Sequence, residues 1–391
     1  MPLTHVAPVN PLSLSGTATH ADGNLGYYNN TLTVLAEGNR YLEYVYTLKE
    51  GDYMMDFHVN SNGLNSLIPS NQNTLELDWI LNLPHTEKSL DNERMYSTVY
   101  YKYLNDDVDY LSETKNDEEE LNGKAQWIGF KHQFFSSVLI NNNGFDRSAL
   151  IKAETHEGSK KFVRELSANI TLPYTHKSEE SIPLQFYFGP NHYQSLSTYN
   201  MDLERMIPLG WGIFRWVNKY AVIPMFNWLD NSIANYGIII LIMTIIIKMV
   251  LAPFTLKAYK SQAKMKVLKP EMDKIQEKHK EKDPMKAQQE VMALYKKTGV
   301  NPLGGCLPML LQMPILFAMF RFFPASIELR QKSFLWADDL SSYDSIMSLP
   351  FEIPFYGDHV SLFTLLMTIS TILYTRMNSQ MSGPQMAQMK W

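Results

Sequence analysis

The sequence lacks the residues that support cysteine-based chemistry. Cys306 is the only cysteine among 391 residues, which excludes an internal disulfide framework and a cysteine-based metal cluster. The acidic run Asp106–Glu120 lacks the spacing and the central glycine of an EF-hand loop, so we expect a solvated loop there and no calcium site. Nothing in the sequence calls for a metal or another cofactor.

Long apolar runs are absent from residues 1–205, which are polar and rich in Asn, Tyr and Glu, and they appear only from about Ile207 onward. Charge is equally uneven. Residues 1–236 carry 17 Lys+Arg and 28 Asp+Glu, whereas residues 255–302 carry twelve Lys, no Arg and six acids. Neither part suggests a nucleic-acid-binding fold. The length exceeds that of one ordinary domain, so we expect a multidomain chain.

Three segments of the second half are candidate membrane helices. Residues 237–254 form a continuous apolar run, and eighteen helical residues span roughly 27 Å, enough for a bilayer core. Residues 303–323 are also long enough. The third segment, residues 361–376, contains the shorter run Ser361–Tyr374, which also fits a buried helix of a soluble core.

The distribution of lysine predicts the orientation of these helices. The 255–302 loop is short and carries the twelve lysines, so the positive-inside rule places it in the cytosol. Residues 324–360 carry only Arg330 and Lys332 against six acids. We therefore expect the 324–360 loop and the N-terminal domain to lie outside, in the periplasm of a two-membrane bacterium, and residues 377–391 to be cytosolic.

Residues 1–205 have the pattern of a β domain. Short runs rich in β-branched and aromatic residues are separated by Gly, Pro, Asn and Asp. Many strands without intervening helical patterns favour a sandwich over a βαβ sheet. The expected strands are Thr31–Ala36, Tyr41–Leu48, Tyr53–Val59 (with Met55, Phe57 and Val59 facing one way), Leu75–Leu81, Tyr96–Leu104, Trp127–Ile140 and Ile182–Phe188.

Two segments flank the first membrane helix. Residues 206–236 combine bulky aromatics with Arg215, Asn218 and Lys219 at helical spacing, which suits an amphipathic helix in the membrane interface, or a hydrophobic helix packed on the β domain. In residues 255–302, apolar residues at three–four spacing predict two helices across a break at Asp283-Pro284, because Asp suits an N-cap and Pro the first helical position. The lysine-rich face of this helical hairpin suits anionic lipid or ribosomal RNA, or simple solvation.

Lys248 lies inside the first apolar run, six residues and so about 9 Å from its cytosolic end. A charge at this depth is costly, and we expect it to face protein or water unless it snorkels to the cytosol. No acid occurs in any of the three apolar segments, so a buried ion pair or a proton relay is not expected. An unpaired cation in a water-accessible groove fits better.

Residues from Trp211 to the end resemble the YidC-type membrane protein insertases. The resemblance rests on Asn301–Phe320, Glu328–Gln331, Pro253–Thr255 and Gln262–Met265. More loosely, Trp127–Ile140 and Phe188–Pro190 are similar to the family's periplasmic domain, a β-supersandwich in Gram-negative members. The resemblance implies the inner membrane as the location, and it implies an N-terminal anchor helix and two further C-terminal helices in a longer protein, of which this chain would be the core.

The family resemblance also implies a mechanism that breaks no bond and needs no catalytic residue or small-molecule substrate. A hydrophilic groove, open to the cytosol, receives the polar part of a client membrane protein while the client's apolar helix enters the lipid bilayer, alone or with the Sec translocon. Lys248, where the family usually has Arg, would line the groove with Thr244 and Gln312. Lys carries a more hydrated point charge than Arg, which puts a bidentate contact in doubt. The ribosome would dock on five lysines of the hairpin, namely Lys257, Lys260, Lys264, Lys266 and Lys269.

Two other functional classes are possible on the residues alone. A membrane-anchored periplasmic enzyme or module acting on glycans would require a carboxylate pair in a cleft of the β domain. A solute transporter would show internal repeats with interrupted helices in matching halves, and the sequence shows no such symmetry.

Overall fold

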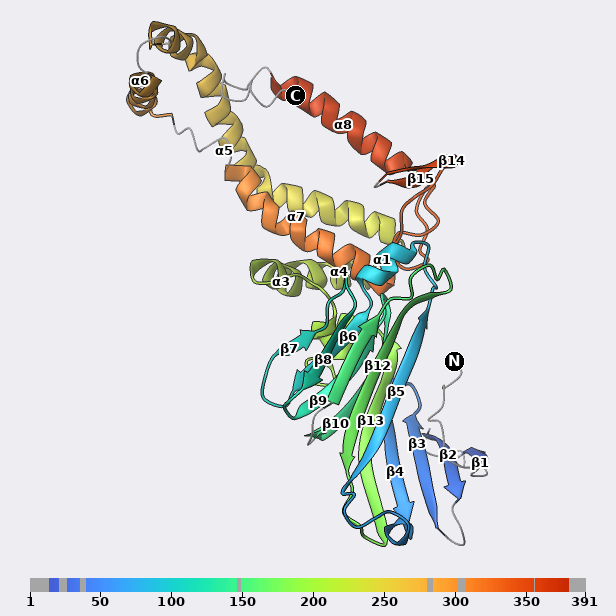
Figure 1. The fold of residues 1–391 in the computed structure, drawn as a ribbon. Helices are drawn as coiled ribbons and strands as arrows, with labels where there is room; N and C mark the ends of the chain where they lie inside the picture. Colours follow the sequence, from blue (N-terminus) through green and yellow to red (C-terminus); the bar gives the residue numbers. More distant parts are fainter. Residues whose placement is uncertain are drawn as a thin grey trace. The chain divides into compact units, whose positions relative to one another are not determined.

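The structure is a computed structural model that describes residues 14–20, 27–35, 40–145, 149–279, 284–300, 307–354 and 356–379. The chain divides into two compact units, Met1–Ile207 and Pro208–Trp391, and each is described by itself. The first is built from strands and the second mainly from helices (Figure 1). This confirms the predicted fold class, an all-β domain followed by a helical domain. The division falls two residues after the expected boundary at residue 205.

Two antiparallel sheets make up the first unit. The nine-stranded sheet has the order β1 (Leu14–His20), β2 (Tyr27–Leu35), β3 (Tyr41–Lys49), β4 (Met54–Asn62), β13 (Glu179–Pro190), β10 (Phe135–Phe145), β9 (Ala125–Lys131), β6 (Thr98–Tyr103) and β7 (Val108–Tyr110). The four-stranded sheet has the order β5 (Thr74–Pro84), β12 (Phe162–Pro173), β11 (Ala149–Glu154) and β8 (Asp117–Leu121). The short helical turns η1 (Leu64–Ser66) and α1 (Leu90–Met95) lie between strands, and α2 (Tyr193–Ser197) and η2 (Leu203–Met206) follow the last strand.

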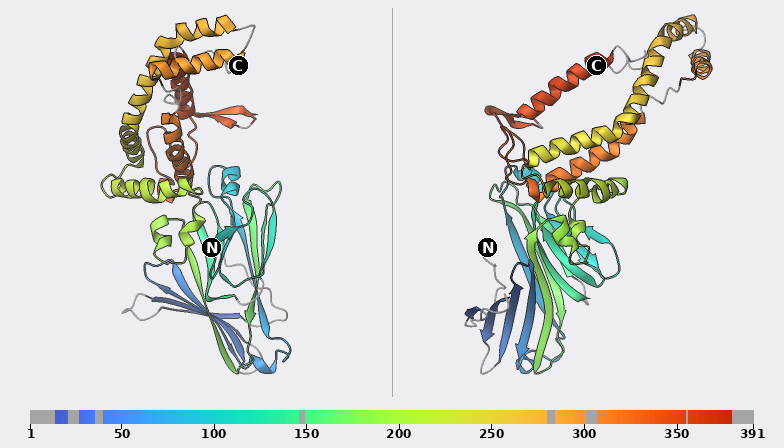
Figure 2. Two further views of the ribbon diagram at one scale, coloured as in Figure 1. Left: turned by 90° about the vertical axis from the view of Figure 1, so that its left-hand side faces the viewer. Right: turned by 180° about the vertical axis from the view of Figure 1, so that it is seen from behind.

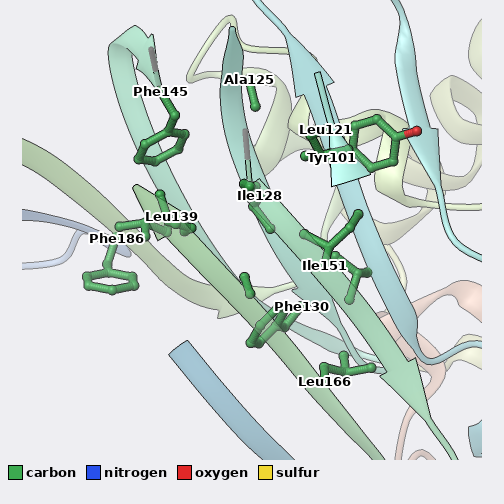
Figure 3. Packing of buried hydrophobic residues seen from close by; sticks show 14 of the residues in the cluster. Tyr101, Leu121, Ala125, Ile128, Phe130, Leu139, Phe145, Ile151, Leu166 and Phe186 are labelled. Carbon is green, nitrogen blue, oxygen red and sulfur yellow. The ribbon is translucent and has the colours of Figure 1, made fainter. Parts of the chain in front are cut away.

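The hydrophobic core of this unit draws on both sheets. Ile128, Leu139 and Phe186 of the larger sheet belong to the same buried cluster as Ile151 and Leu166 of the smaller one (Figure 3). Trp79 of β5 stacks on Phe130 of β9 with ring centroids 3.8 Å apart. Alternation along each strand directs every second side chain into this layer. The first unit is therefore a sandwich with its own core.

The sequence pattern located several strands and misplaced others. Phe57 and Val59 of β4 are buried and Met55 packs against the core cluster, on the side that their alternation predicts. The run Trp127–Ile140 is two strands, because the chain turns where the His132 N–H donates to the Phe135 carbonyl at 2.8 Å. The expected loop Asp106–Glu120 contains β7 and most of β8. Its carboxylates are solvated because β8 is an edge strand.

The second unit begins with a run of three short helices, α3 (Ile213–Val217), the π-helical turn η3 (Asn218–Val222) and α4 (Ile223–Asp230). The remaining elements are α5 (Tyr236–His279), α6 (Pro284–Thr298), α7 (Leu307–Ala325), η5 (Ile327–Leu329), β14 (Met347–Ile353), β15 (Gly357–Val360) and α8 (Leu362–Ser379). Within the expected segment 206–236, the helical part is thus continuous over residues 213–230, with a π-helical turn in its middle.

Helix α5 is longer than the sequence pattern suggested. We expected a membrane helix to end at residue 254 and a separate hairpin to follow, but α5 continues unbroken through Pro253 and Pro270 to His279. Helix α6 packs back on its far end, where the Tyr295 hydroxyl donates to the Met272 sulfur at 3.2 Å. Asp283, the expected N-cap of α6, lies outside the described residues.

Helices α5 and α7 lie side by side and antiparallel (Figure 1). Phe226 of α4 contacts both Tyr236 at the start of α5 and Phe322 near the end of α7, with ring centroids 5.9 and 5.3 Å away. Residues 303–306 of the expected second membrane segment lie outside the described residues, and α7 reaches two residues beyond its expected end.

The segment between α7 and α8 is more ordered than the loop that we expected over 324–360. It contains η5 and a two-stranded antiparallel hairpin of β14 and β15. Met377, Asn378 and Ser379 of the expected cytosolic segment 377–391 belong to α8, and residues 380–391 lie outside the described part of the chain. Among the described residues, one helix is long and apolar enough to cross a membrane, Tyr236–Met265 of α5, and the apolar helices Leu310–Ala325 and Leu362–Arg376 are shorter.

Candidate functional site

Lys248 lies on an exposed face of α5. Leu241, Thr244, Ile245 and Lys248 follow one another at three–four spacing, so they form one stripe of the helix, and all four are exposed. Ile239 and Met243, on another side of the helix, are fully buried. The structure therefore brings Thr244 and Lys248 together on one face, as their spacing predicts.

The Lys248 ammonium has no hydrogen bond or ion pair with any other described residue. Thr244 is different, because its hydroxyl donates to the carbonyl of Ile240 in its own helix at 2.8 Å. The Thr244 oxygen still has acceptor capacity, whereas the three Lys248 N–H donors are unused by the described residues. This stripe thus carries an uncompensated cation among apolar side chains.

Gln312 lies on α7 at a similar level along the helix pair. It precedes Phe322 by ten residues, about 15 Å of helix, and Lys248 follows Tyr236 by twelve residues, about 18 Å. Phe226 contacts both Phe322 and Tyr236, so these two residues lie at about the same height along the helix pair. Lys248 and Gln312 are therefore at similar distances from that height. Gln312 is half-buried, whereas Lys248 is exposed.

The short helices α3 to α4 contain a polar residue whose role the sequence did not reveal. Asn218 was grouped with Arg215 and Lys219 on a polar face, but its side chain is fully buried while Lys219 is exposed. The Asn218 amide donates to the carbonyls of Leu209 and Ala318 at 2.8 and 2.9 Å. Trp211, Trp216 and Trp228 are exposed instead. The sequence signal that could have revealed the buried role of Asn218 is that it is a lone polar residue on an otherwise apolar face of the helix.

The lysines predicted to dock the ribosome lie along the part of α5 that follows Pro253. Lys257, Lys260 and Lys264 are exposed and Lys269 is half-buried, and the Lys266 side chain lies outside the described part. Where α6 folds back, the Glu290 carboxylate lies 3.1 Å from the His279 ring and 3.8 Å from the Lys278 ammonium. The exposed lysines therefore remain available for an anionic surface.

The β domain has a hollow of about 270 Å³ on its larger sheet. Its polar lining comes from Asp56, His58, Asn141, Asn142, Asn143 and Gln185, and Asp56 is the only carboxylate among the lining residues. The Gln185 amide donates to the Asp56 carboxylate at 2.9 Å. This hollow thus lacks the carboxylate pair that a glycan-processing site requires. Within the described residues, no group of three His, Cys, Asp or Glu side chains is placed to hold a metal ion.

Comparisons with known families assign both units. The model described as YidC periplasmic domain matches residues 18–223, and the model described as 60Kd inner membrane protein matches residues 228–391. Together with the membrane-length helix, these matches define the class as an inner-membrane protein with a large periplasmic-type β domain. The chain belongs to the YidC family.

Relatives named membrane protein insertase YidC match most of this chain. The protein of Parabacteroides distasonis is 44% identical over 362 residues, which cover 89% of this chain and 57% of the relative. The protein of Bacteroides fragilis is 43% identical over 372 residues, covering 92% and 60%. That of Porphyromonas gingivalis is 40% identical over 370 residues, covering 90% and 59%. The chain thus spans about three fifths of the length of these curated relatives.

Proposed function

We propose that this chain is the core of a membrane protein insertase, which passes client transmembrane segments into the inner membrane. The observation that carries the proposal is Lys248, an exposed cation without a partner among the described residues, in the helix that is long enough to span the bilayer. Its relatives bear the name insertase, and no described feature suggests a catalytic centre. Insertion requires binding and transfer, not the breaking of a bond.

The physical argument concerns the polar part of the client. Polar groups that enter an apolar medium without hydrogen-bond partners cost several kcal/mol, roughly 2–7 each. Lys248, Thr244 and Gln312, at about one level of α5 and α7, would offer such partners and retain water in a groove open to the cytosol. Because Lys248 is only about 9 Å from the cytosolic end of the apolar run, a groove of that depth already shortens the apolar path.

The proposed topology follows from charge and from the helices together. α5, α7 and α8 would cross the inner membrane, with the lysine-rich end of α5 and α6 in the cytosol and the β domain and residues 324–360 in the periplasm. The exposed tryptophans of α3 to α4 would lie in the membrane interface. Client membrane proteins, the lipid bilayer, the Sec translocon and the ribosome are the proposed partners.

Replacing Lys248 in a full-length protein tests the proposed groove. Lys248→Arg keeps the charge and should retain insertion, whereas Lys248→Ala should lower the insertion of at least some clients several-fold. Lys296→Ala, which removes an exposed charge from α6 outside the proposed docking lysines, is the matched control and should insert clients normally. Normal insertion of every tested client by Lys248→Ala would refute the role of this residue.

The proposed ribosome contact requires a separate experiment. Replacing Lys257, Lys260, Lys264, Lys266 and Lys269 with Gln should weaken co-sedimentation with ribosomes and make the remaining binding less dependent on salt, because fewer phosphate contacts form. The matched control replaces Lys296 and Lys297 of α6. Unchanged binding and an unchanged salt dependence in the five-residue variant would exclude these lysines as the contact.

A further inference from the structure

The segment between α7 and β14 forms a compact turn beside the beginnings of two helices. Leu329 and Ala337 are buried within it. The N–H groups of Phe334 and Ala337 each donate to the other residue's carbonyl, at 2.9 and 3.0 Å, which closes a tight turn around Trp336. The segment lies next to the first turn of α5 and next to the start of α8 (Figure 1 and Figure 2). One rigid piece of chain therefore faces both helices.

Phe334 packs directly on the backbone at the start of α5. Gly237, the second residue of α5, is buried, and a Cβ atom at this position would overlap with the Phe334 ring. Glycine is therefore required for the ring to lie so close to the helix backbone. The Lys332 ammonium lies 5.5 Å from the ring centroid of Tyr236, the residue before Gly237. Two successive residues of α5 thus contact the same turn.

Trp336 and Asp344 hold the start of α8. The buried Asp344 carboxylate accepts hydrogen bonds from the N–H groups of Leu362 and Phe363 at 2.8 and 3.1 Å. The Trp336 indole donates to the same carboxylate at 3.0 Å, and its ring centroid lies 4.6 Å from that of Phe363. Phe334 on α5 and Trp336 on α8, two residues apart, thus form a clamp between the beginnings of these two helices.

Contacts at its ends, more than packing along its length, position α8 among the described residues. Near the far end of α8, the Tyr374 hydroxyl shares a hydrogen bond with the hydroxyl of Tyr259 of α5. Between the two ends, four apolar side chains are between 48% and 64% exposed, namely Leu366, Met367, Ile369 and Leu373. In a bilayer such side chains gain no hydrophobic free energy by leaving lipid, because lipid tails are equally apolar. The clamp is therefore a main determinant of where α8 stands relative to α5.

We propose that Gly237 and Phe334 are positioning residues for insertion, which keep α8 off the exposed stripe of α5 that carries Lys248. Leu241 and Ile245 of this stripe are exposed, so α8 does not cover them in the clamped structure. Released at its start, α8 would be free to lie over the stripe, because van der Waals packing is available to any two apolar helix faces in lipid. A client would then lose access to Lys248. This inference rests on the proposed function, in which Lys248 receives the client.

Spin-label distances in lipid bilayers test the clamp without relying on insertion activity. The protein is a full-length one with Cys306→Ser and no other cysteine. Nitroxides on Ile245→Cys and Ile369→Cys measure the separation of α5 and α8, and nitroxides on Ile245→Cys and Phe320→Cys measure that of α5 and α7. All three side chains are exposed. Client insertion is measured in parallel with unlabelled proteins.

Four single variants and one double variant are compared with the parent. Phe334→Ala removes the ring, Gly237→Ala places a methyl group where the ring lies, and Phe334→Leu keeps an apolar side chain in the clamp. Leu335→Ala is the matched control, because it shortens the next side chain of the same turn, which is 71% exposed. The double variant combines Gly237→Ala with Phe334→Ala.

Phe334→Ala and Gly237→Ala should each broaden the α5–α8 distances toward shorter values and lower insertion several-fold, while the α5–α7 distances stay unchanged. Phe334→Leu and Leu335→Ala should resemble the parent. The double variant should be no worse than Phe334→Ala alone, because the added methyl group then has no ring to displace.

Unchanged α5–α8 distances in Phe334→Ala would overturn the proposal, whatever the insertion assay shows. Broadened distances with normal insertion would show that the clamp does not serve insertion, and altered α5–α7 distances would show a general loss of fold. Either result would also overturn it. If the parent itself inserts no client, the proposed function fails, and the role of the clamp in insertion fails with it.

Discussion

Lys131 of β9 is a cation inside the β domain, in contrast to the exposed Lys248. Its side chain is fully buried, and its ammonium donates to the Tyr96 carbonyl at 2.6 Å. The ammonium also lies 5.4 Å from the ring centroids of Tyr96 and Tyr100. Burial lowers the Lys131 pKa from 10.5 to about 8, against the opposing field of Glu113.

This pKa predicts how the stability of the β domain depends on pH. Between the folded value and the unfolded value of 10.5, the unfolded chain binds more protons, so the free energy of unfolding rises with pH. The urea midpoint of the β domain should therefore increase from about pH 7.5 to about pH 9.5, and Lys131→Met should remove most of this increase. Lys49→Met, at the exposed end of β3, is the control. An equal rise in all three proteins would contradict the assignment to Lys131.

The pKa of Asp344 is set by hydrogen bonds to its charged form, whereas the pKa of Lys131 is set by burial. Burial raises its pKa, but hydrogen bonds from Ser361, Phe363, Trp336 and Leu362 outweigh burial and hold the pKa below its usual value of 3.8. A lowered carboxyl pKa means that the stabilisation is present above the unfolded pKa and is lost as the pH falls through the folded one.

Asp344→Asn should therefore loosen the first turn of α8. Loss of such a cap costs about 0.5–2 kcal/mol, so amide exchange of the first α8 residues should accelerate by roughly 2- to 30-fold near neutral pH. The difference from the parent protein should shrink in strong acid, where Asp344 itself becomes protonated. Asp358→Asn, on the exposed surface of β15, is the matched control. Unchanged exchange in Asp344→Asn would show that the cap does not hold the helix.

At the scale of elements, the junction of helices α3 to α4 with α7 depends on Asn218. Its two hydrogen bonds tie η3 to the Leu209 and Ala318 carbonyls, and the side-chain oxygen of Asn218 has no partner among the described residues. Asn218→Leu leaves two carbonyls without this donor and should destabilise the helical unit by about 1–3 kcal/mol. Thermal unfolding in detergent measures the loss. Lys219→Leu, an exposed neighbour, should have little effect, and equal melting of both variants would contradict the role of Asn218.

The same elements show what the sequence could and could not reveal. Strand β12 was not predicted, although Leu166, Ala168, Ile170 and Leu172 alternate with polar residues, because Ala and the interleaved Ser and Asn weaken the β signal. The position of Lys248 on the face of Thr244 followed from helical spacing alone. Whether Asn218 faces solvent or α7 depends on a tertiary contact 100 residues away, which no local pattern contains.

At the scale of the whole molecule, the two family models meet between residues 223 and 228, whereas the compact units divide after Ile207. Helices α3 to α4 thus lie in the helical unit of the structure, but most of their residues fall within the match to the periplasmic-domain model. The core of the β domain lies entirely within the first unit. These boundaries separate a sandwich with its own core from the helices that would carry out insertion.

Two deletions in a full-length protein test this separation. Removing residues 27–190 should leave most insertion activity intact, because in the proposed mechanism the client would pass from cytosol to lipid without meeting the β domain. Extending the deletion through Leu229 removes Asn218 and the interfacial tryptophans and should be damaging. An insertion assay with matched expression levels compares the two. Equal loss in both would show that the β domain takes part in the transfer itself.

The uninterrupted course of α5 has a mechanical consequence. Its 44 residues follow a helical path of about 66 Å that bends along its course (Figure 1), and the 26 residues after Pro253 make about 39 Å of it. Proline removes a backbone hydrogen bond and gives the helix a compliant point near the end of the apolar run. Because no loop interrupts the helix, a force on its lysine-rich part after Pro253 is transmitted to the turns around Lys248. A rotation of about ten degrees at Pro253 displaces the far end of the helix by roughly 7 Å. In the proposed topology, this one helix would join the cytosolic contact directly to the segment in the bilayer.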